Sequence, residues 1–394
     1  MKFDWLIVGC GFTGATAARQ LAEQHGMKVL VVDRRDHVAG NAYDYVDSNG
    51  LLVHRYGPHI FHTNSAKVFS FLSRFTEWTV YFHRVKGMVG GCYVPLPFNL
   101  NSVSALFPAG AANRLCEALI SEFGYGARVP VLKLRDSKSH ELKDIAAFVY
   151  ENVFLNYTKK QWDLLPDELD PGVTARVPIV LNRDDRYFSD KYQAMPTQGY
   201  TALFGNMLDH PNISVQLGAV WTDLKGKALS DRVIFTGPID EFFDHRCGEL
   251  PYRSLRFEMK SEINAEFPNE CTTINFPNAF DFTRVTLQHR LTGQRGNAQL
   301  SVYEYPCRYM REANEPYYPI PAPPNQVLLQ RYRELSATLA GSVFFAGRLG
   351  DYQYYNMDQA CARGMALVEK EIPQAMGGHS NSISIQDARL RTVV

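Results

Sequence analysis

Apolar residues at the start of the chain fall into two short runs separated by a helical pattern. Residues 3–8 and 28–32 are nearly continuous apolar segments, a pattern typical of strands buried on both faces of a parallel sheet. Residues 15–24 have the Ala, Leu and Arg content of a helix, and Gly26 is placed to end it. The pattern predicts a strand, a helix and a second strand that ends at Asp33.

A glycine-rich turn joins the first strand to the helix. Gly9 allows a tight turn, Gly11 lets the backbone approach a pyrophosphate, and Gly14 lets the helix pack close to the strand. Asp33 can accept hydrogen bonds from a ribose. We therefore predict a dinucleotide site; the alternative is a glycine turn that serves only helix packing. The turn reads Gly9-Cys10-Gly11-Phe12-Thr13-Gly14.

Further along the chain the spacing of the apolar residues changes. Residues 78–96 alternate in short bursts typical of antiparallel strands, and residues 99–156 carry apolar residues at helical spacing. Residues 252–259, 272–276 and 283–289 look like strands of a second sheet. Residues 232–238 and 343–350, each a strand followed by a glycine turn, return the chain to the first sheet, as in FAD proteins whose cofactor domain is built from separated pieces.

The predicted fold is α/β: an FAD-binding Rossmann-like domain built from separated segments, a small helical insert and an antiparallel β-sheet domain. A proline-rich loop near 164–178, which carries Arg176, is expected to be a mobile lid. The tail turns to Gly, Ser and Asn and is expected to be poorly ordered. The expected division is 1–77, 195–240 and 340–372 for the FAD-binding domain, 100–163 for the insert, 78–99, 164–194 and 241–339 for the sheet domain, and 373–394 for the tail.

Composition limits the possible partners. Lys plus Arg (41) balances Asp plus Glu (41), so no net charge favours nucleic acid or an acidic membrane, and anionic ligands must be met by local arginines. No apolar run approaches the ~20 residues of a membrane span, and the first strand leaves no room for a signal peptide. We expect a cytoplasmic protein. Seven cysteines without C-x-x-C spacing argue against a disulfide framework or a zinc site.

Residues 54–63 hold three histidines and two aromatic residues around a Gly-Pro turn. Metal ligation by His59 and His62 is conceivable, but no Asp, Glu or Cys lies nearby in sequence to complete a set. A role beside a cofactor ring is the favoured interpretation, and structural histidines are the remaining one. No metal site is predicted.

Several motifs together resemble the prokaryotic UDP-galactopyranose mutases, in order and spacing, from Met1 to about Ile372. They are residues 9–14, 56–63, 157–162, 236–240, 252–255, 317–319 and 347–350.

The resemblance implies an isomerase, an intramolecular transferase of cell-surface polysaccharide biosynthesis. In this family reduced FAD attacks the anomeric carbon of a nucleotide-diphosphate sugar through N5, and the pyranose and furanose forms interconvert without net oxidation. NAD(P)H or another reductant would reduce the flavin. The family is usually homodimeric. The first expected substrate pair is UDP-galactopyranose and UDP-galactofuranose.

The resemblance also implies roles for individual residues. Arg176 and Arg284 would bind the diphosphate, and His59 would lie beside the flavin. Substrate would be bound by Tyr157, Trp162, Tyr187, Arg253, Tyr318, Tyr354 and Asn356. The cofactor would be bound by Gly9, Gly11, Phe12, Thr13, Gly14, Asp33, Arg34, Gly40, Asn41, Gly57, His59, Ile60, Gly347, Arg348, Tyr355 and Met357.

Two positions depart from the family pattern. The family usually has Glu where this chain has Leu287, and Asp where it has Asn356. Loss of two carboxylates near the sugar would change which hydroxyls are bound, so UDP-N-acetylgalactosamine, dTDP-fucose and GDP-linked sugars are alternatives. Two other classes are an FAD oxidoreductase of the amine-oxidase type and a flavoprotein fold kept only for binding.

Overall fold

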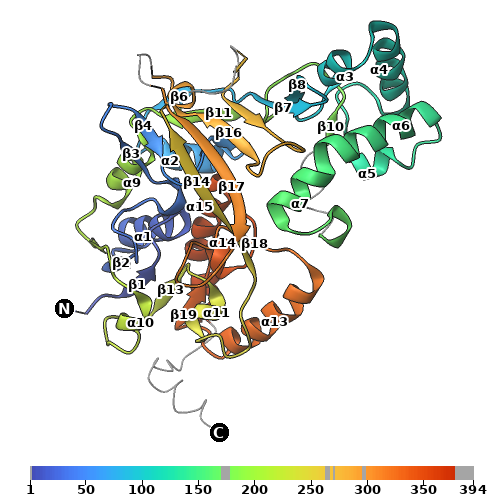
Figure 1. Ribbon diagram of the computed structural model, residues 1–394. Coiled ribbons are helices and arrows are strands. Elements are labelled where there is room, and N and C mark those ends of the chain that lie inside the picture. Colours follow the sequence, from blue (N-terminus) through green and yellow to red (C-terminus); the bar gives the residue numbers. More distant parts are fainter. Residues whose placement is uncertain (1, 170–177, 262–266, 269–270, 295–298, 378–394) are drawn as a thin grey trace.

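The structure is a computed structural model that describes residues 2–169, 178–261, 267–268, 271–294 and 299–377. Figure 1 shows a parallel sheet with its helices at the lower left, a long twisted antiparallel sheet across the middle, and a group of helices that projects at the upper right.

The parallel sheet has the strand order β12-β2-β1-β13-β19. Its inner strands are short, apolar and buried on both faces, as expected for a parallel sheet covered by helices. Helix α1 (Phe12–His25) packs against α15 (Met357–Ala366), where a Cβ at Gly364 would lie 2.6 Å from the Thr13 carbonyl oxygen. The strands come from distant segments, as predicted: β1 Trp5–Val8, β2 Val29–Val32, β12 Ile213–Gln216, β13 Val233–Phe235 and β19 Val343–Phe345.

The second sheet has seven strands in the order β18-β14-β17-β16-β15-β7-β8. All neighbours are antiparallel except β15 and β7. The strand expected over 283–289 ends at Leu287, because α12 begins at Gln288. The strands are β7 Val85–Val89, β8 Cys92–Leu96, β14 Tyr252–Lys260, β15 Thr273–Asn275, β16 Arg284–Leu287, β17 Ser301–Arg308 and β18 Tyr318–Pro319.

The helical insert packs on β7 and β8 around one apolar core. Strand β9 (Arg128–Val129) pairs with β10 (Ile179–Val180), so this part of the segment 164–194 joins the insert and not the seven-stranded sheet. Apolar side chains at 179 and 181 account for this, since both lie in the core of the insert. The insert contains α3 Leu100–Leu106, α4 Ala109–Phe123, α5 Val131–Leu134, α6 His140–Val149, the π-helix η2 Tyr150–Leu155 and α7 Asn156–Trp162.

A three-stranded sheet, β5-β11-β6, links the two larger sheets. Strand β6 was expected in the same sheet as β7 and β8, but it pairs with β11. Its strands are β5 Phe61–Thr63, β6 Trp78–Val80 and β11 Tyr192–Pro196. The other elements are η1 Gly40–Ala42, β3 Asp44–Val46, β4 Leu52–His54, α2 Ala66–Leu72, η3 Pro166–Glu168, α9 Gly199–Leu208, α10 Trp221–Leu224, α11 Ile239–Phe242, α12 Gln288–Leu291, α13 Pro323–Ala337, α14 Gly347–Gly350, η4 Leu367–Glu371 and α16 Ile372–Gly377.

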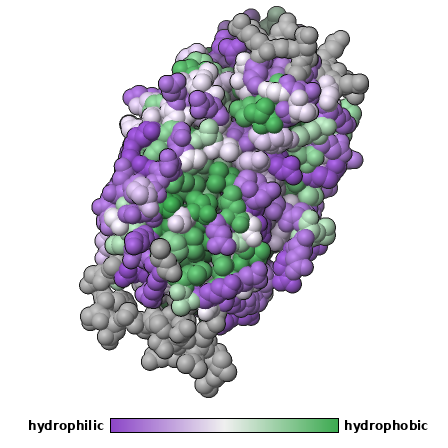
Figure 2. Space-filling model, turned by 90° about the vertical axis from the view of Figure 1, so that its left-hand side faces the viewer, coloured by the Kyte–Doolittle hydropathy of each residue, from purple (hydrophilic) through white to green (hydrophobic). Residues whose placement is uncertain are grey.

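The surface is mixed in polarity. Figure 2 shows an apolar area in the middle of the face that lies at the left of Figure 1, with polar side chains around it. Val215 and Leu217, in and after the edge strand β12, are 39% and 37% exposed. No helix within the described ranges is long and apolar enough to cross a membrane.

Candidate active site

A large cavity opens at the carboxyl ends of β1, β2 and β13, beside the N-termini of α1, α14 and α15. Its empty volume, open mouth included, is about 1190 Å³. Most of the residues predicted to bind a cofactor line it, together with Asn356, which was expected to bind substrate. They are Gly9, Gly11, Phe12, Thr13, Gly14, Asp33, Arg34, Gly40, Asn41, His59, Gly347, Arg348 and Met357.

The glycines of this cavity are required by close backbone approach. Gly9 has φ +106°, and a Cβ there would lie 1.9 Å from Thr236 Oγ1. A Cβ at Gly14 would lie 2.0 Å from the Gly9 carbonyl oxygen, and one at Gly40 would lie 3.1 Å from the Gly11 Cα. Gly11 is the N-cap of α1 and no side chain caps the helix. The free N–H groups at this end suit a phosphate.

Asp33 lies at the end of β2 and lines the cavity, as the sequence predicts. Its Oδ2 accepts a hydrogen bond from the Cys10 N–H at 2.8 Å, and its Oδ1 accepts one from the Arg35 N–H at 3.0 Å. The carboxylate therefore fixes the glycine turn through the Cys10 N–H. A ribose hydroxyl that binds Asp33 would donate to an oxygen that already accepts a backbone hydrogen bond.

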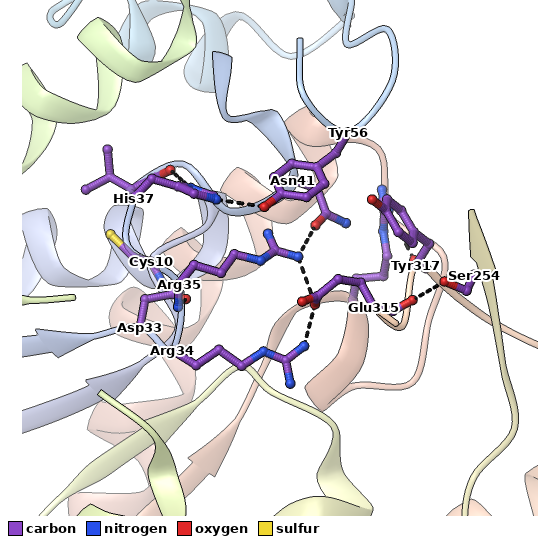
Figure 3. A network of polar contacts seen from close by, with 12 residues as sticks. Cys10, Asp33, Arg34, Arg35, His37, Asn41, Tyr56, Ser254, Glu315 and Tyr317 are labelled. Carbon is purple, nitrogen blue, oxygen red and sulfur yellow. Dashed lines mark hydrogen bonds and ion pairs between the residues drawn. The ribbon is translucent and has the colours of Figure 1, made fainter. Parts of the chain in front are cut away.

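One carboxylate joins two arginines among the residues that line the cavity (Figure 3). Glu315, in the loop before β18, accepts hydrogen bonds from Arg34 and from Arg35, the latter at 3.0 Å. Arg35 also donates to Asn41 Oδ1 at 2.9 Å and lies 4.4 Å from the centre of the Tyr56 ring. These contacts join the loop after β2 to the loop before β18. Both arginines line the cavity and can supply positive charge to an anionic ligand.

A second group of polar residues surrounds Arg284 on the seven-stranded sheet. Arg284 on β16 lies directly opposite Glu304 on β17, and its Nη2 donates to Glu304 Oε1 at 2.8 Å. Glu304 is only 1% exposed. Burial works against the charge of Arg284, but Glu304 outweighs it, so the pKa of Arg284 is raised well above its usual value.

Four of the tyrosines predicted to bind substrate lie around this pair. Burial raises the pKa of Tyr157, Tyr187 and Tyr318, so these hydroxyls stay protonated and can donate hydrogen bonds. The charge of Arg284 acts on all three, and Tyr354 adjoins them. The Tyr318 and Tyr354 rings stack with centroids 5.4 Å apart. Such a cluster offers one cation and several neutral donors to an anion.

Arg348 connects the tyrosine cluster to the cavity. It lines the cavity, and its guanidinium lies 5.4 Å from the ring centres of both Tyr318 and Tyr354. Its Nη2 donates to the Tyr355 carbonyl at 2.6 Å. The cofactor cavity and the tyrosine cluster are therefore two parts of one site.

His59 is held as a neutral imidazole. Burial lowers its pKa to about 3, and His54, Arg348 and Arg284 add to this direction. Its Nδ1 lies 2.9 Å from the Gly57 carbonyl oxygen. A carbonyl oxygen only accepts, so Nδ1 carries the proton and Nε2 is left as an acceptor.

Other predicted site residues have different surroundings. Ile60 is 8% exposed in the core, and Gly57 packs against Phe257 and Glu304; neither lines the cavity. Tyr355 meets Arg348 through its backbone only. Trp162 is 9% exposed, with its ring 6.1 Å from that of Tyr318. Arg176 and most of the expected lid lie outside the described residues.

His62 was considered as a metal ligand with His59. Its Nδ1 lies 3.0 Å from Asp190 Oδ2, and its ring stacks on Phe188 with centroids 3.7 Å apart. Over the ranges that the structure describes, no three His, Cys, Asp or Glu residues gather as metal ligands.

Leu287, where the family usually has a Glu, does not join the polar residues around Arg284. Side chains alternate along a strand, so Leu287, three positions after Arg284, points to the opposite face of β16. It is fully buried there. The carboxylate beside Arg284 comes instead from Glu304. An isolated Glu in an otherwise apolar and aromatic strand pattern was the signal that could have found it.

Comparisons with known proteins agree with this geometry. The family model for UDP-galactopyranose mutase matches residues 152–354, and one for an NAD(P)-binding Rossmann-like domain matches residues 7–75. A Klebsiella pneumoniae protein named probable UDP-galactopyranose mutase is 35% identical over 93% of this chain and 94% of its own length. The Escherichia coli dTDP-fucopyranose mutase is 34% identical over 90% and 94%.

The fold is also that of a solved structure. A reduced UDP-galactopyranose mutase superposes with a TM-score of 0.73 at 17% identity, covering 99% of this chain and 98% of that one. Taken with the sequence matches over nearly the full length, this places the chain in the UDP-galactopyranose mutase family.

Proposed function

We propose that this protein is a flavin-dependent mutase that interconverts the pyranose and furanose forms of a nucleotide-diphosphate sugar. The observation that carries the proposal is the junction at Arg348, where a dinucleotide cavity meets a tyrosine cluster built around a paired arginine. A net oxidation of an amine would need no such site for an anionic leaving group.

FAD is the cofactor that we propose for the cavity. The fit rests on Gly9 and Gly14, where a Cβ would clash, and on the N-terminus of α1 at Gly11, which no side chain caps. Gly11 and Arg34 would meet the diphosphate, while His59, Arg348 and Met357 would meet the ring system. A reduced flavin bound there supplies a nucleophile for the anomeric carbon.

The remaining chemistry belongs to the side chains. In this proposal Arg284 holds the departing diphosphate, since a guanidinium can bind it through two N–H groups. Tyr157, Tyr187 and Tyr318 donate hydrogen bonds to the same oxygens. Trp162 packs near the nucleotide base, and the aromatic wall keeps water away from an electrophilic sugar carbon.

His59 is proposed to accept a hydrogen bond beside the cofactor. Its Nε2 is available to accept a hydrogen bond at the cavity wall, because Nδ1 is engaged by Gly57. Arg176 is proposed as a second diphosphate ligand by family resemblance alone.

UDP-galactose is the first substrate we propose, because a relative named for it matches at 35% identity. The dTDP-fucopyranose mutase matches almost as well, at 34%, so dTDP-fucose is the closest alternative. Reduction by NAD(P)H, a cytoplasmic homodimer and a role in cell-surface polysaccharide synthesis are proposed on the family resemblance.

A product assay tests the proposal. The purified protein is reduced with dithionite and incubated separately with UDP-galactofuranose, UDP-N-acetylgalactosamine, dTDP-fucopyranose and GDP-linked sugars, and ring isomers are separated by chromatography. We expect an isomer with at least one sugar, and only after reduction. A yellow, reducible protein that isomerises none of them would contradict the proposal.

A further inference from the structure

Arg253 is buried on β14 and directs its guanidinium at the end of a helix. It is 6% exposed. Its Nε donates to the Gln161 carbonyl at 3.0 Å and its Nη2 donates to the Lys160 carbonyl at 3.1 Å, while Nη1 lies 3.7 Å from Asp163 Oδ2. All three contacts are with the last residues of α7 or the residue that follows it.

These carbonyls need an outside partner. The last carbonyls of a helix have no N–H group within it, and a cation beside them is favoured by the helix dipole. Helix α7 stops abruptly, because Asp163 adopts φ +58° and its N–H returns to the Lys159 carbonyl. Arg253 therefore serves as the cap of α7 from another part of the chain.

Helix α7 is held on the seven-stranded sheet by further polar contacts. The Lys160 ammonium donates to the Phe276 and Ala279 carbonyls, both at 2.9 Å. Asn156 Nδ2 donates to Asn278 Oδ1 at 2.9 Å. The helix continues directly from the π-helix η2, so the Lys160 contacts and Arg253 hold the end of α7 that is not supported by the preceding helix.

The same short helix carries two of the residues assigned to the nucleotide. Tyr157 lies in its first turn and Trp162 at its last position. A shift of α7 would move both aromatic side chains together. The Nε and Nη2 groups of Arg253 already donate to helix carbonyls, whereas the Nε of Arg284 has no hydrogen-bond partner among the described residues and remains available to a ligand.

We propose that Arg253 is a positioning residue that fixes α7, and with it Tyr157 and Trp162, and that it does not itself bind the diphosphate. This inference rests on the proposed function, since it concerns the nucleotide half of the same site. It replaces the substrate-binding role that family resemblance implies for Arg253.

The two roles of Arg253, diphosphate ligand or positioning residue, predict different losses of affinity for uridine, UMP and UDP. A direct diphosphate ligand matters only when phosphates are present, so its loss weakens UDP binding and spares uridine. A residue that positions α7 affects both Trp162 beside the base and Tyr157 at the diphosphate, so its loss weakens uridine binding as well as UMP and UDP binding, and UDP binding by the larger factor. Calorimetric binding of these three ligands to the oxidised holoprotein separates the roles, with the thymidine series used if the wild type prefers it.

We expect Arg253→Ala to weaken uridine binding by about tenfold and UDP binding by at least as much, with flavin still bound; the lost hydrogen bonds to the Lys160 and Gln161 carbonyls should lower the melting temperature without unfolding the protein at 25 °C. Trp162 fluorescence should shift to longer wavelength, and the shift should vanish in an Arg253→Ala, Trp162→Phe double variant. Arg253→Lys, which keeps the charge but can reach only one carbonyl well, should recover part of the affinity. Arg256→Ala, an exposed arginine on the same strand paired with Glu258, is the control and should match the wild type.

Loss of UDP binding with uridine binding retained, or unchanged binding of every ligand, would overturn the inference. Wild-type protein that binds no nucleotide of either series would instead count against the proposed function. The wild-type measurements therefore test the function, and the ratio between variants tests Arg253.

Discussion

Glu304 lies directly across the strand pair from Arg284 and accepts its hydrogen bond at 2.8 Å, in a position where the carboxylate is almost fully buried. A buried carboxylate fixes both the charge and the direction of the guanidinium, so Arg284 is ordered before any ligand arrives. The cost of desolvating Glu304 is offset by this pairing.

Arg284→Ala should lower turnover by at least about 100-fold, the size expected when a fixed charge at a developing anion is removed. Flavin should remain bound, because Arg284 does not line the dinucleotide cavity. Turnover by chromatography and flavin content by absorbance check both parts. Arg256→Ala is the matched control, and normal turnover in the Arg284 variant would contradict the mechanism.

Glu315→Gln should speed flavin release about fivefold, which corresponds to roughly 1 kcal/mol for a partly exposed pair. Glu315 joins Arg34 and Arg35 among the residues that line the cavity. Although burial opposes it, the two arginines lower the pKa of Glu315 overall, so the pairing persists at neutral pH. Release is followed by the recovery of flavin fluorescence. Glu312→Gln is the control, and an unchanged rate would argue against the clamp.

Acid should destabilise the fold below about pH 6.5. Burial lowers the pKa of His54, His59 and His83 to about 3 in the folded protein, against roughly 6.5 when unfolded. Between these values the unfolded chain binds more protons, so the free energy of unfolding falls as pH falls, by up to ~1.4 kcal/mol per unit for each histidine. Urea unfolding at pH 7 and 5.5 measures it. His54→Asn should reduce the average slope over this range by about 0.6 proton; an equal slope would contradict the assignment.

Leu287→Glu should destabilise the protein by roughly 3 kcal/mol or more, because it buries a carboxylate without a partner on the core face of β16. It should not change the choice of sugar. Asn356→Asp is the contrasting variant, because Asn356 is the N-cap of α15 and lines the cavity. An Asp caps a helix as well as an Asn does, so this variant should keep the stability of the wild type. Thermal unfolding compares the two. A stable Leu287→Glu protein would show that this side chain reaches solvent or the site.

The glycine turn could be predicted because its determinants are local. The strand, Gly9, Gly14 and the helix follow within a few residues, and each requirement is a matter of backbone space. The return of distant strands to one sheet was also readable, since each ends in a glycine turn. A motif comparison does not show that Leu287 and Arg284 face opposite sides of β16, because this follows from the strand and its alternation.

Contacts between segments that are far apart in the chain could not be predicted from the sequence. Arg253 reaches α7 across 92 residues, and Glu315 reaches Arg34 across 281. Nothing near either residue in sequence shows which carbonyl or guanidinium it will meet, because the partner is set by how the sheets pack. The family resemblance assigns Arg253 to the substrate, whereas its guanidinium contacts the carbonyls at the end of α7, and no sequence motif includes Glu315.

A mutase does not consume its reduced flavin, so the most direct measurement is the number of product molecules formed per electron pair supplied. The protein is reduced once with a stoichiometric amount of dithionite under nitrogen, excess nucleotide sugar is added, and ring isomer and flavin oxidation are followed together. We predict many turnovers for each electron pair, with the flavin still reduced at the end. One product or fewer per electron pair, with the flavin oxidised, would contradict the mutase and indicate a net redox enzyme.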